Sequence, residues 1–340
     1  MRLDLIMGTI VFAICWGRAG PAAAAACTAP NHADAQALAP ADAAYRTPEG
    51  RVRVVGYNDM AEMLDKLGAI FERKYPGIAF EWRLNGTRAA PGPLIDGSSA
   101  FAPMGAEFGP AHFAAWRQVH DADPLAVPVA HDSLTPGALS SPTGIFVHAS
   151  NPLRSISVDM LRRVLAPLPG EARIRLWREL GVLGAAGGRP IRPVGLAEDT
   201  AIGALMLRRL QADGYVPEFD ARRQSRDVVA AVADTRDALG IANLNHAGPG
   251  IRALVIIDRS GREIAGDIDG IRSGLYPFDR HLLIYVRRDA NECVEAMAHA
   301  FLCLALSPEG QRVIAEGSRG YLPLNPIEID HARSTIGGCQ

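Results

Sequence analysis

Four turns of the chain combine small residues with hydroxyl, carboxylate or guanidinium side chains, and each joins a predicted strand to a predicted helix. They cover residues 56–60, 85–90, 104–108 and 197–201. In open α/β sheets, ligands bind outside the carboxyl ends of the strands. The N–H groups at helix starts also attract anions. The four turns therefore predict a binding site for a small anion.

The side chains that support catalysis in other proteins form no recognisable arrangement in this sequence. It contains no Gly-x-Ser-x-Gly elbow and no His-x-x-x-His spacing. The histidines His112, His120, His131 and His148 are scattered along the chain. We therefore expect no catalytic residues, no metal site and no cofactor, and we expect that the protein is not an enzyme.

The elements that position the four turns alternate between strands and helices. Residues 51–57 and 78–84 have strand patterns, and they flank an amphipathic helix at 60–75. Further helices are expected at 109–120, 158–165, 200–212, 226–239 and 290–306, with strands at 143–149, 189–195, 253–258 and 281–288. This alternation indicates an α/β fold with mostly buried sheets.

Length and composition favour two domains and a small-molecule partner. The 340 residues are 48% hydrophobic, which is enough for two cores. The net charge of −2 gives no basic surface for nucleic acid. Lysine is rare, and the arginine excess alone does not indicate anion binding. No nucleic-acid partner is expected.

The N-terminus has the order of a secretory signal peptide, which we place at residues 1–26. Arg2 precedes an apolar run at 5–16, and small residues follow at 21–26. The run is about a dozen residues, shorter than the ~20 of a membrane-spanning helix. A periplasmic location follows. Ordinary cleavage and acylation of Cys27 to give a lipoprotein are both open.

Four cysteines remain after such cleavage, an even number that suits disulfides in an oxidising compartment. Cys293 and Cys303 lie ten residues apart on one predicted helix, a rise of roughly 15 Å. They cannot bridge each other. A bridge between Cys27 and Cys339 and a buried, unbridged Cys303 are both open alternatives.

Several segments resemble the periplasmic phosphate-binding proteins of ABC transporters. The C-terminal segment FLCLALSPEGQRVIAEGSRGYLPLNPIEI, at 301–329, is similar to the closing segment of that family. RVVGYNDMAEMLDKLGAIFERKYPGI resembles its first strand, binding loop and helix, and NGTRAAPGPLIDGSSAFAPM its second loop and the following strand. The matching segments follow the order and spacing of the family, and together they extend over residues 52–329.

The resemblance implies a two-lobed periplasmic-binding-protein fold of the type II-like class, with a hinge and an interlobe cleft. The chain would cross between lobes near 127–146 and return near 276–286. Lobe 1 is expected at 51–130 plus 280–330 and lobe 2 at 131–279. A flexible leader at 27–50 and a C-terminal tail at 331–340 complete the expected organisation.

In its first two loops, the chain departs from the family pattern. Asp59 and Met60 occupy the positions where the family grips phosphate with a threonine hydroxyl and the next N–H. A carboxylate thus replaces a donor, and Asp59 could instead cap the following helix. In the second loop Thr87 preserves a hydroxyl, and Arg88 replaces a small residue. Arg88 is either a new anion ligand or an exposed loop residue.

The third and fourth loops depart further. Gly105 stands where the family has an aspartate that accepts the proton of hydrogen phosphate, and Glu107 lies two positions on. Leu196 stands where the family has an arginine, and Asp199 and Thr200 follow it. These last two residues are either ligands or helix caps. Arg88, or the more distant Arg192, could restore the missing cation.

Two hypotheses follow. The leading one is an exported, monomeric solute-binding protein that binds phosphate or a related small oxyanion and delivers it to an ABC permease. Lobe closure would be a hinge motion. The alternative is a sensor, adaptor or secreted interaction protein that retains the fold with a decayed or altered ligand site. Loss of the arginine and aspartate favours the alternative, whereas Thr87 beside Arg88 favours a changed ligand.

Overall fold

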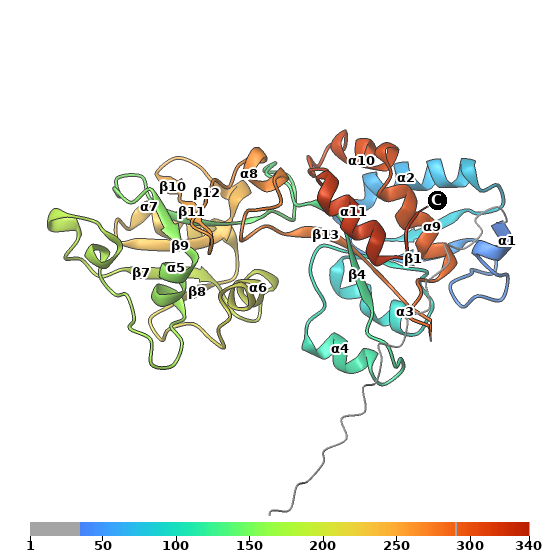
Figure 1. Cartoon of the computed structure of the whole chain (residues 1–340), viewed down its shortest axis with the longest axis horizontal. Helices are drawn as coiled ribbons and strands as arrows, with labels where there is room; N and C mark the ends of the chain where they lie inside the picture. Colours follow the sequence, from blue (N-terminus) through green and yellow to red (C-terminus); the bar gives the residue numbers. More distant parts are fainter. Residues whose placement is uncertain (1–34, 290, 340) are drawn as a thin grey trace, which may run out of the picture.

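The computed structural model describes residues 35–289 and 291–339. The predicted signal peptide and Cys27 lie outside these described residues. Figure 1 shows two lobes side by side, joined by extended segments of the chain. No helix within the described ranges is both long and apolar enough to span a membrane.

Lobe 1 begins with a βαβ unit. Strands β1 (Val52–Val55) and β2 (Phe80–Arg83) pair in parallel, and α2 (Ala61–Lys74) connects them. Met63, Leu64 and Leu67 recur at helical spacing in α2 and are buried. The second sheet is antiparallel, in the order β3 (Ala102–Met104), β13 (His281–Val286) and β4 (Leu125–His131).

The remaining helices of lobe 1 pack around these two sheets (Figure 1). Side-chain caps stabilise the starts of some of them. Ser307 accepts a hydrogen bond from Gly310 N at the start of α10, and Asn325 with Glu328 forms a capping box on α11. The helices are α1 (Ala35–Leu38), α3 (Pro91–Ile95), α4 (Pro110–Trp116), α9 (Ala296–Ala305), α10 (Pro308–Ala315) and α11 (Pro326–Thr335).

Lobe 2 is built on a five-stranded mixed sheet. Its strand order is β10 (Ile251–Ala253), β5 (Thr143–His148), β9 (Ala238–Asn243), β7 (Arg192–Leu196) and β8 (Asp220–Arg222). A smaller sheet has the order β12 (Glu263–Ile264), β11 (Val255–Ile257) and β6 (Ser155–Ser157). The helices are α5 (Val158–Leu165), α6 (Ala201–Leu210), α7 (Ser225–Asp234) and α8 (Ile268–Arg272).

Each lobe has its own main hydrophobic core. In lobe 1, Phe71, Phe80, Phe101 and Phe301 interlock through ring contacts of 4.6–6.3 Å between centroids. The core of lobe 2 lies between residues 145 and 278 and includes the buried Trp177. The chain therefore has the two-lobed α/β architecture that the sequence predicts.

The described part of the expected flexible leader, residues 35–50, is packed and buries Leu38 and Tyr45 in the core of lobe 1. The expected tail at 331–340 begins inside α11, and its residues Ala332 and Ile336 are buried. Both findings have one cause. Isolated apolar side chains in short segments give no periodic pattern, although a neighbouring core can cover them.

Two element boundaries and one additional strand also differ from the expectations. The predicted helix at 226–239 ends at Asp234, and Leu239 lies in β9 because the apolar run from Ala238 pairs with β5 and β7. The predicted helix at 290–306 begins only at Ala296, so Cys293 lies before it. Strand β4 lies in the segment that was expected only as a lobe crossing.

A disulfide joins Cys303 in α9 to Cys339, with 5.5 Å between their Cα atoms. The expected alternative of a Cys27–Cys339 bridge is therefore wrong, and Cys303 is not an unbridged core residue. The bridge holds the C-terminal residues against α9. Spacing along the sequence could not reveal it, because the partner approaches through the packing of α11.

Loss of this bridge should destabilise the protein. Cys303→Ser, Cys339→Ser and the double variant should each lower the free energy of unfolding by roughly 4 kcal/mol, because a 36-residue separation is no longer closed in the unfolded chain. Denaturant unfolding under non-oxidising and oxidising conditions measures this loss. A double variant clearly less stable than either single variant would contradict a shared bridge.

Candidate functional site

A pocket lies between the lobes where the second crossing of the chain enters β13. Lobe 1 contributes the loop after β3, and lobe 2 contributes one face of α6. The lining residues are Gly105, Ala106, Glu107, Ala201, Leu205, Arg208, Arg209, Asp279, Arg280, His281 and Leu283. Three arginines and one histidine face two carboxylates in this set, so the pocket is rich in cationic groups.

An ion pair connects the two lobes across this pocket. Arg208 on α6 lies with Nη2 2.8 Å from Oε2 of Glu107. Both side chains are nearly half exposed, so the pair contributes little to stability. It nevertheless places a carboxylate of lobe 1 directly against a cation of lobe 2. The neighbouring Arg209 has no ion-pair partner among residues 35–289 and 291–339.

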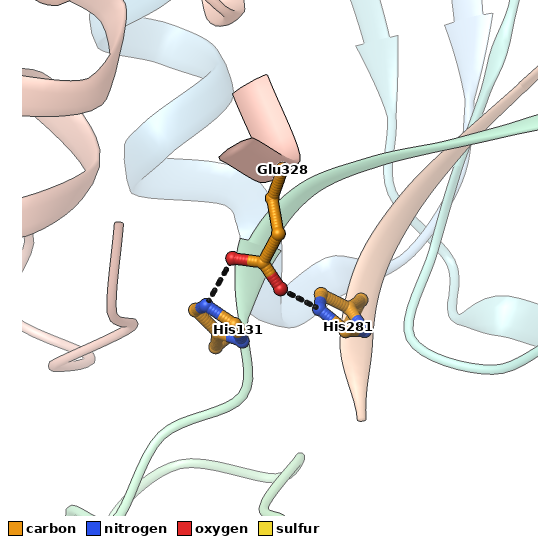
Figure 2. Close-up of side chains that lie close together, drawn as sticks. All are labelled: His131, His281 and Glu328. Carbon is orange, nitrogen blue, oxygen red and sulfur yellow. Dashed lines mark ion pairs between the residues drawn. The ribbon is translucent and has the colours of Figure 1, made fainter. Parts of the chain in front are cut away.

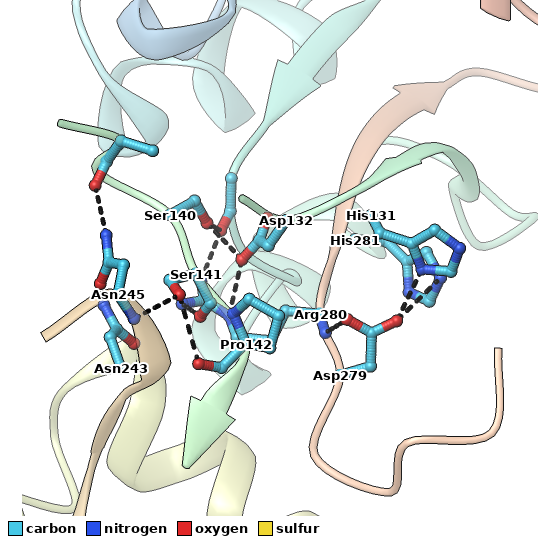
Figure 3. A network of polar contacts seen from close by, with 12 residues as sticks. His131, Asp132, Ser140, Ser141, Pro142, Asn243, Asn245, Asp279, Arg280 and His281 are labelled. Atoms are coloured by element: carbon cyan, nitrogen blue, oxygen red, sulfur yellow. Dashed lines mark hydrogen bonds and ion pairs between the residues drawn. The ribbon is translucent and has the colours of Figure 1, made fainter. Parts of the chain in front are cut away.

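Arg280 anchors the pocket at the hinge. Its Nη2 donates to the carbonyl of Gly105 at 2.7 Å, and its Nε lies 3.6 Å from Oδ2 of Asp132. Asp132 is fully buried and also accepts a hydrogen bond from Ser140 Oγ at 2.6 Å. Burial raises the pKa of Asp132 above its usual value, and the opposing effects of Arg280 and Ser140 are smaller. Figure 3 shows this network.

Residues 132–142 form the first crossing between the lobes, which we call the crossing segment. Lobe 2 holds it through Asn245, which follows β9. Asn245 donates from Nδ2 to the carbonyl of Ala138 at 2.9 Å and from its backbone N to Ser141 Oγ at 3.1 Å (Figure 3). The crossing segment is therefore fixed on both sides of the hinge by hydrogen bonds.

The first predicted loop does not face the pocket. Asp59 is buried and accepts hydrogen bonds from Tyr321 Oη at 2.5 Å and Leu139 N at 2.8 Å, with Arg319 at 3.1 Å. The carboxylate therefore joins three segments of the chain and does not cap α2. Met60 is fully buried in the core of lobe 1. Neither side chain lines the pocket.

The second and third loops meet, but the family geometry is altered. Thr87 Oγ1 accepts a 3.4 Å hydrogen bond from Gly105 N, while Arg88 is exposed and does not line the pocket. A side chain at Gly105 would place its Cβ 2.4 Å from the ring of Tyr57. Tyr57 thus occupies the space that an aspartate at this position would need.

In the fourth loop, the polar side chains make structural contacts and do not line the pocket. Thr200 caps α6, because its Oγ1 accepts a hydrogen bond from Gly203 N at 3.0 Å. Asp199 is exposed and pairs with Arg223 at 2.7 Å, which lowers the pKa of Asp199 with a smaller contribution from Arg88. Leu196 is buried in lobe 2. Arg192 lies at the opposite end of β7.

The structure therefore brings together Thr87, Gly105 and Glu107, and it leaves Asp59, Met60, Asp199 and Thr200 outside the pocket. Sequence reasoning missed Arg208, Arg209 and Arg280. Arg280 lies in a segment that resembles the family's return crossover, but nothing in that segment marks its side chain as a pocket residue. The two arginines of α6 look like ordinary basic residues of a helix end.

A second polar cluster lies beside the pocket and contains His131, His281 and Glu328 (Figure 2). The two histidines stand opposite each other on paired strands β4 and β13. Nε2 of His131 lies 3.0 Å from Oε2 of Glu328, and Nε2 of His281 lies 3.5 Å from Oε1. Metal-ligand spacing is absent from the sequence, yet the fold assembles three ligand-type side chains.

Two carboxylates set the charge state of this cluster. Burial alone would lower the pKa of His131, but Asp279, 2.6 Å from its Nδ1, and Glu328 together raise it to about 9. Burial would raise the pKa of Glu328, but His131 and His281 lower it well below its usual range. The cluster is therefore a compact, paired group of charges at the hinge.

Comparisons with protein families and with individual proteins agree on the kind of protein that this chain resembles. A family model described as "PBP superfamily domain" matches residues 39–309. The phosphate-binding protein PstS of Pseudomonas aeruginosa is 24% identical over 293 residues, which cover 85% of this chain and 87% of that protein. These matches confirm the resemblance to phosphate-binding proteins.

Solved structures with the same fold include PstS from Borrelia burgdorferi, with a TM-score of 0.54 and 13% identity over 81% of this chain and 99% of that one. An ABC-type phosphate transport receptor from Vibrio cholerae gives a TM-score of 0.52 and 14% identity over 79% and 98%. At these identities the likeness concerns the fold, and it confirms the two-lobed architecture.

Substitution of Gly105 should disturb the loop that lines the pocket. Gly105→Ala and Gly105→Asp should each lower the free energy of unfolding by about 1–3 kcal/mol, because the added atoms meet the Tyr57 ring. Gly92→Ala is a matched control in lobe 1, since nothing lies within 4 Å of a Cβ there. Thermal unfolding measures the difference, and equal stability of Gly105→Asp and the parent would contradict the close approach.

Proposed function

The chain belongs to the PBP superfamily, and we propose that it binds phosphate or a related small oxyanion in the pocket between its lobes. The observation that carries the proposal is the lining of this pocket by Arg208, Arg209 and Arg280 from two separate parts of the fold. Phosphate binding by relatives such as PstS supports the choice of ligand class.

The charges of the pocket suit a small anion. Glu107 neutralises Arg208, and Asp132 lies 3.6 Å from Arg280, so Arg209 supplies the cation that no carboxylate of the described chain balances. Guanidinium groups bind oxyanions through paired N–H donors. An anion between α6 and the loop after β3 would therefore contact both lobes and favour their closure.

Glu107 supplies the acceptor that Gly105 lacks. An ionised carboxylate accepts a hydrogen bond from the proton of hydrogen phosphate, whereas a sulfate dianion has no proton to donate. The 2.8 Å contact with Arg208 holds the Glu107 carboxylate in the pocket. We therefore propose that Glu107 favours protonated oxyanions over unprotonated ones.

The same proposal includes the cellular role. The N-terminal sequence pattern and the phosphate-transport relatives support an exported, periplasmic protein that delivers its ligand to an ABC permease. We propose that it acts as a monomer, without catalysis and without a nucleic-acid partner. Acylation of Cys27, which would anchor the protein to a membrane, stays a prediction from the sequence.

A sensor or adaptor with an altered ligand site is the second candidate function. Tyr57 fills the space beside Gly105, and Leu196 is buried where the family pattern has an arginine. With Gly105 in place of the family's aspartate and Leu196 in place of its arginine, the chain lacks the charge pairing of the family pattern. If the arginines of α6 and the hinge bind no anion, this candidate accounts better for the pocket.

Removal of Arg209 should weaken anion binding without affecting folding. Arg209→Ala should raise the Kd for phosphate at least about tenfold, because a hydrogen bond to a charged group contributes about 1.5–3 kcal/mol. Isothermal titration calorimetry with phosphate measures this. Arg236→Ala is the matched control, since Arg236 is also exposed but precedes β9 at the end away from the pocket. Parent-like affinity in Arg209→Ala would exclude Arg209 from the site.

Replacement of Glu107 should change selectivity more than overall affinity. In Glu107→Gln, the ratio of sulfate Kd to phosphate Kd should fall on the order of tenfold, because the amide repels sulfate less and accepts the phosphate proton less well. Parallel titrations with the two anions give the ratio. An unchanged ratio would show that Glu107 does not face the bound anion.

A further inference from the structure

The cluster beside the pocket has the composition of a metal site. His131, His281 and Glu328 offer two imidazole nitrogens and one carboxylate oxygen, and these three ligand atoms lie within 4.8 Å of one another. We propose that they form a binding site for one first-row transition-metal dication of the Zn²⁺ type. The inference does not rest on the proposed anion function.

The distances suit a tetrahedral centre. Zinc bonds to imidazole nitrogen and carboxylate oxygen are about 2.0–2.2 Å long, so neighbouring ligand atoms are separated by roughly 3.4 Å. His131 Nε2 lies 3.0 Å from Oε2 of Glu328 and His281 Nε2 lies 3.5 Å from Oε1, and one ligand atom of each residue lies within 4.8 Å of the other two. Rotation of the His281 ring, which is 25% exposed, closes the set around an ion.

His131 is held ready as a ligand. Its Nδ1 lies 2.6 Å from Oδ2 of Asp279, an arrangement in which Nδ1–H donates to the carboxylate and Nε2 points toward Glu328. This Nε2 is buried and makes no well-aligned hydrogen bond. A carboxylate on the far nitrogen of a ligating histidine orients the ring and raises its basicity. Asp279 is therefore the positioning residue.

The site has an entry path and an open position. His281 also lines the interlobe pocket, so an ion and its water reach the cluster from that side. Three protein ligands leave a fourth position for solvent. The ligands come from β4, β13 and α11, so a bound ion would tie the C-terminal helix to both strands that lead into the hinge.

The first test is binding of Zn²⁺ to the purified full chain, stripped with chelator and kept in phosphate-free, non-reducing buffer. One equivalent should bind with saturation in isothermal titration calorimetry, and the melting temperature should rise with Zn²⁺ concentration. Co²⁺ in place of Zn²⁺ should give the visible absorption of a tetrahedral centre, whereas Mg²⁺ should bind far more weakly because it prefers oxygen ligands.

Two variants decide whether these residues are the ligands. Glu328→Gln keeps the capping box of α11, which accepts glutamine, but removes the carboxylate, and His281→Ala removes a partly exposed ring. Each should weaken Zn²⁺ binding by ~100-fold or more, and Asp279→Asn by roughly 10- to 100-fold. His331→Ala, exposed on the same helix, should bind like the parent.

The proposal fails if the parent binds no stoichiometric Zn²⁺, in which case the cluster is an ion-paired network only. It also fails if Glu328→Gln and His281→Ala, folded by circular dichroism, bind Zn²⁺ with parent affinity. Phosphate titrations of the same variants give a separate readout, so failure of the metal site is distinguishable from failure of the anion site.

Discussion

The buried contact between Asp132 and Arg280 is the interaction on which the arrangement of the hinge depends. Asp132 follows β4 on the first crossing, and Arg280 precedes β13 on the second. A fully buried carboxylate requires compensation by a cation or by hydrogen-bond donors. Arg280 and Ser140 supply both, and Arg280 also binds the carbonyl of Gly105. One guanidinium thereby fixes both crossings and one wall of the pocket.

This constraint explains how the pocket keeps its shape although its side chains differ from the family pattern. The hinge network keeps the loop after β3 opposite α6, whatever side chains the two surfaces present. Tyr57 and Leu196 then fill space with apolar groups, while Arg208 and Arg209 bring cations from the helix. Anion recognition moves from the loops toward α6 and β13 in the proposed function.

The hinge also places the histidine cluster. Strands β4 and β13 pair antiparallel with His131 directly opposite His281, so any side chains at these positions must share one surface. The capping box of α11 orients Glu328 toward them. The cluster and the interlobe pocket consequently share His281.

The fold class and many of the elements follow from the sequence, because their patterns are local. The helix at 158–165 has the predicted bounds, and Thr200 has the residue type and position of a helix cap. The disulfide partner of Cys303, the role of Arg280 and the meeting of His131 with Glu328 were decided only by tertiary structure. These contacts join residues distant in sequence, and their energies depend on burial and direction, which no local pattern contains.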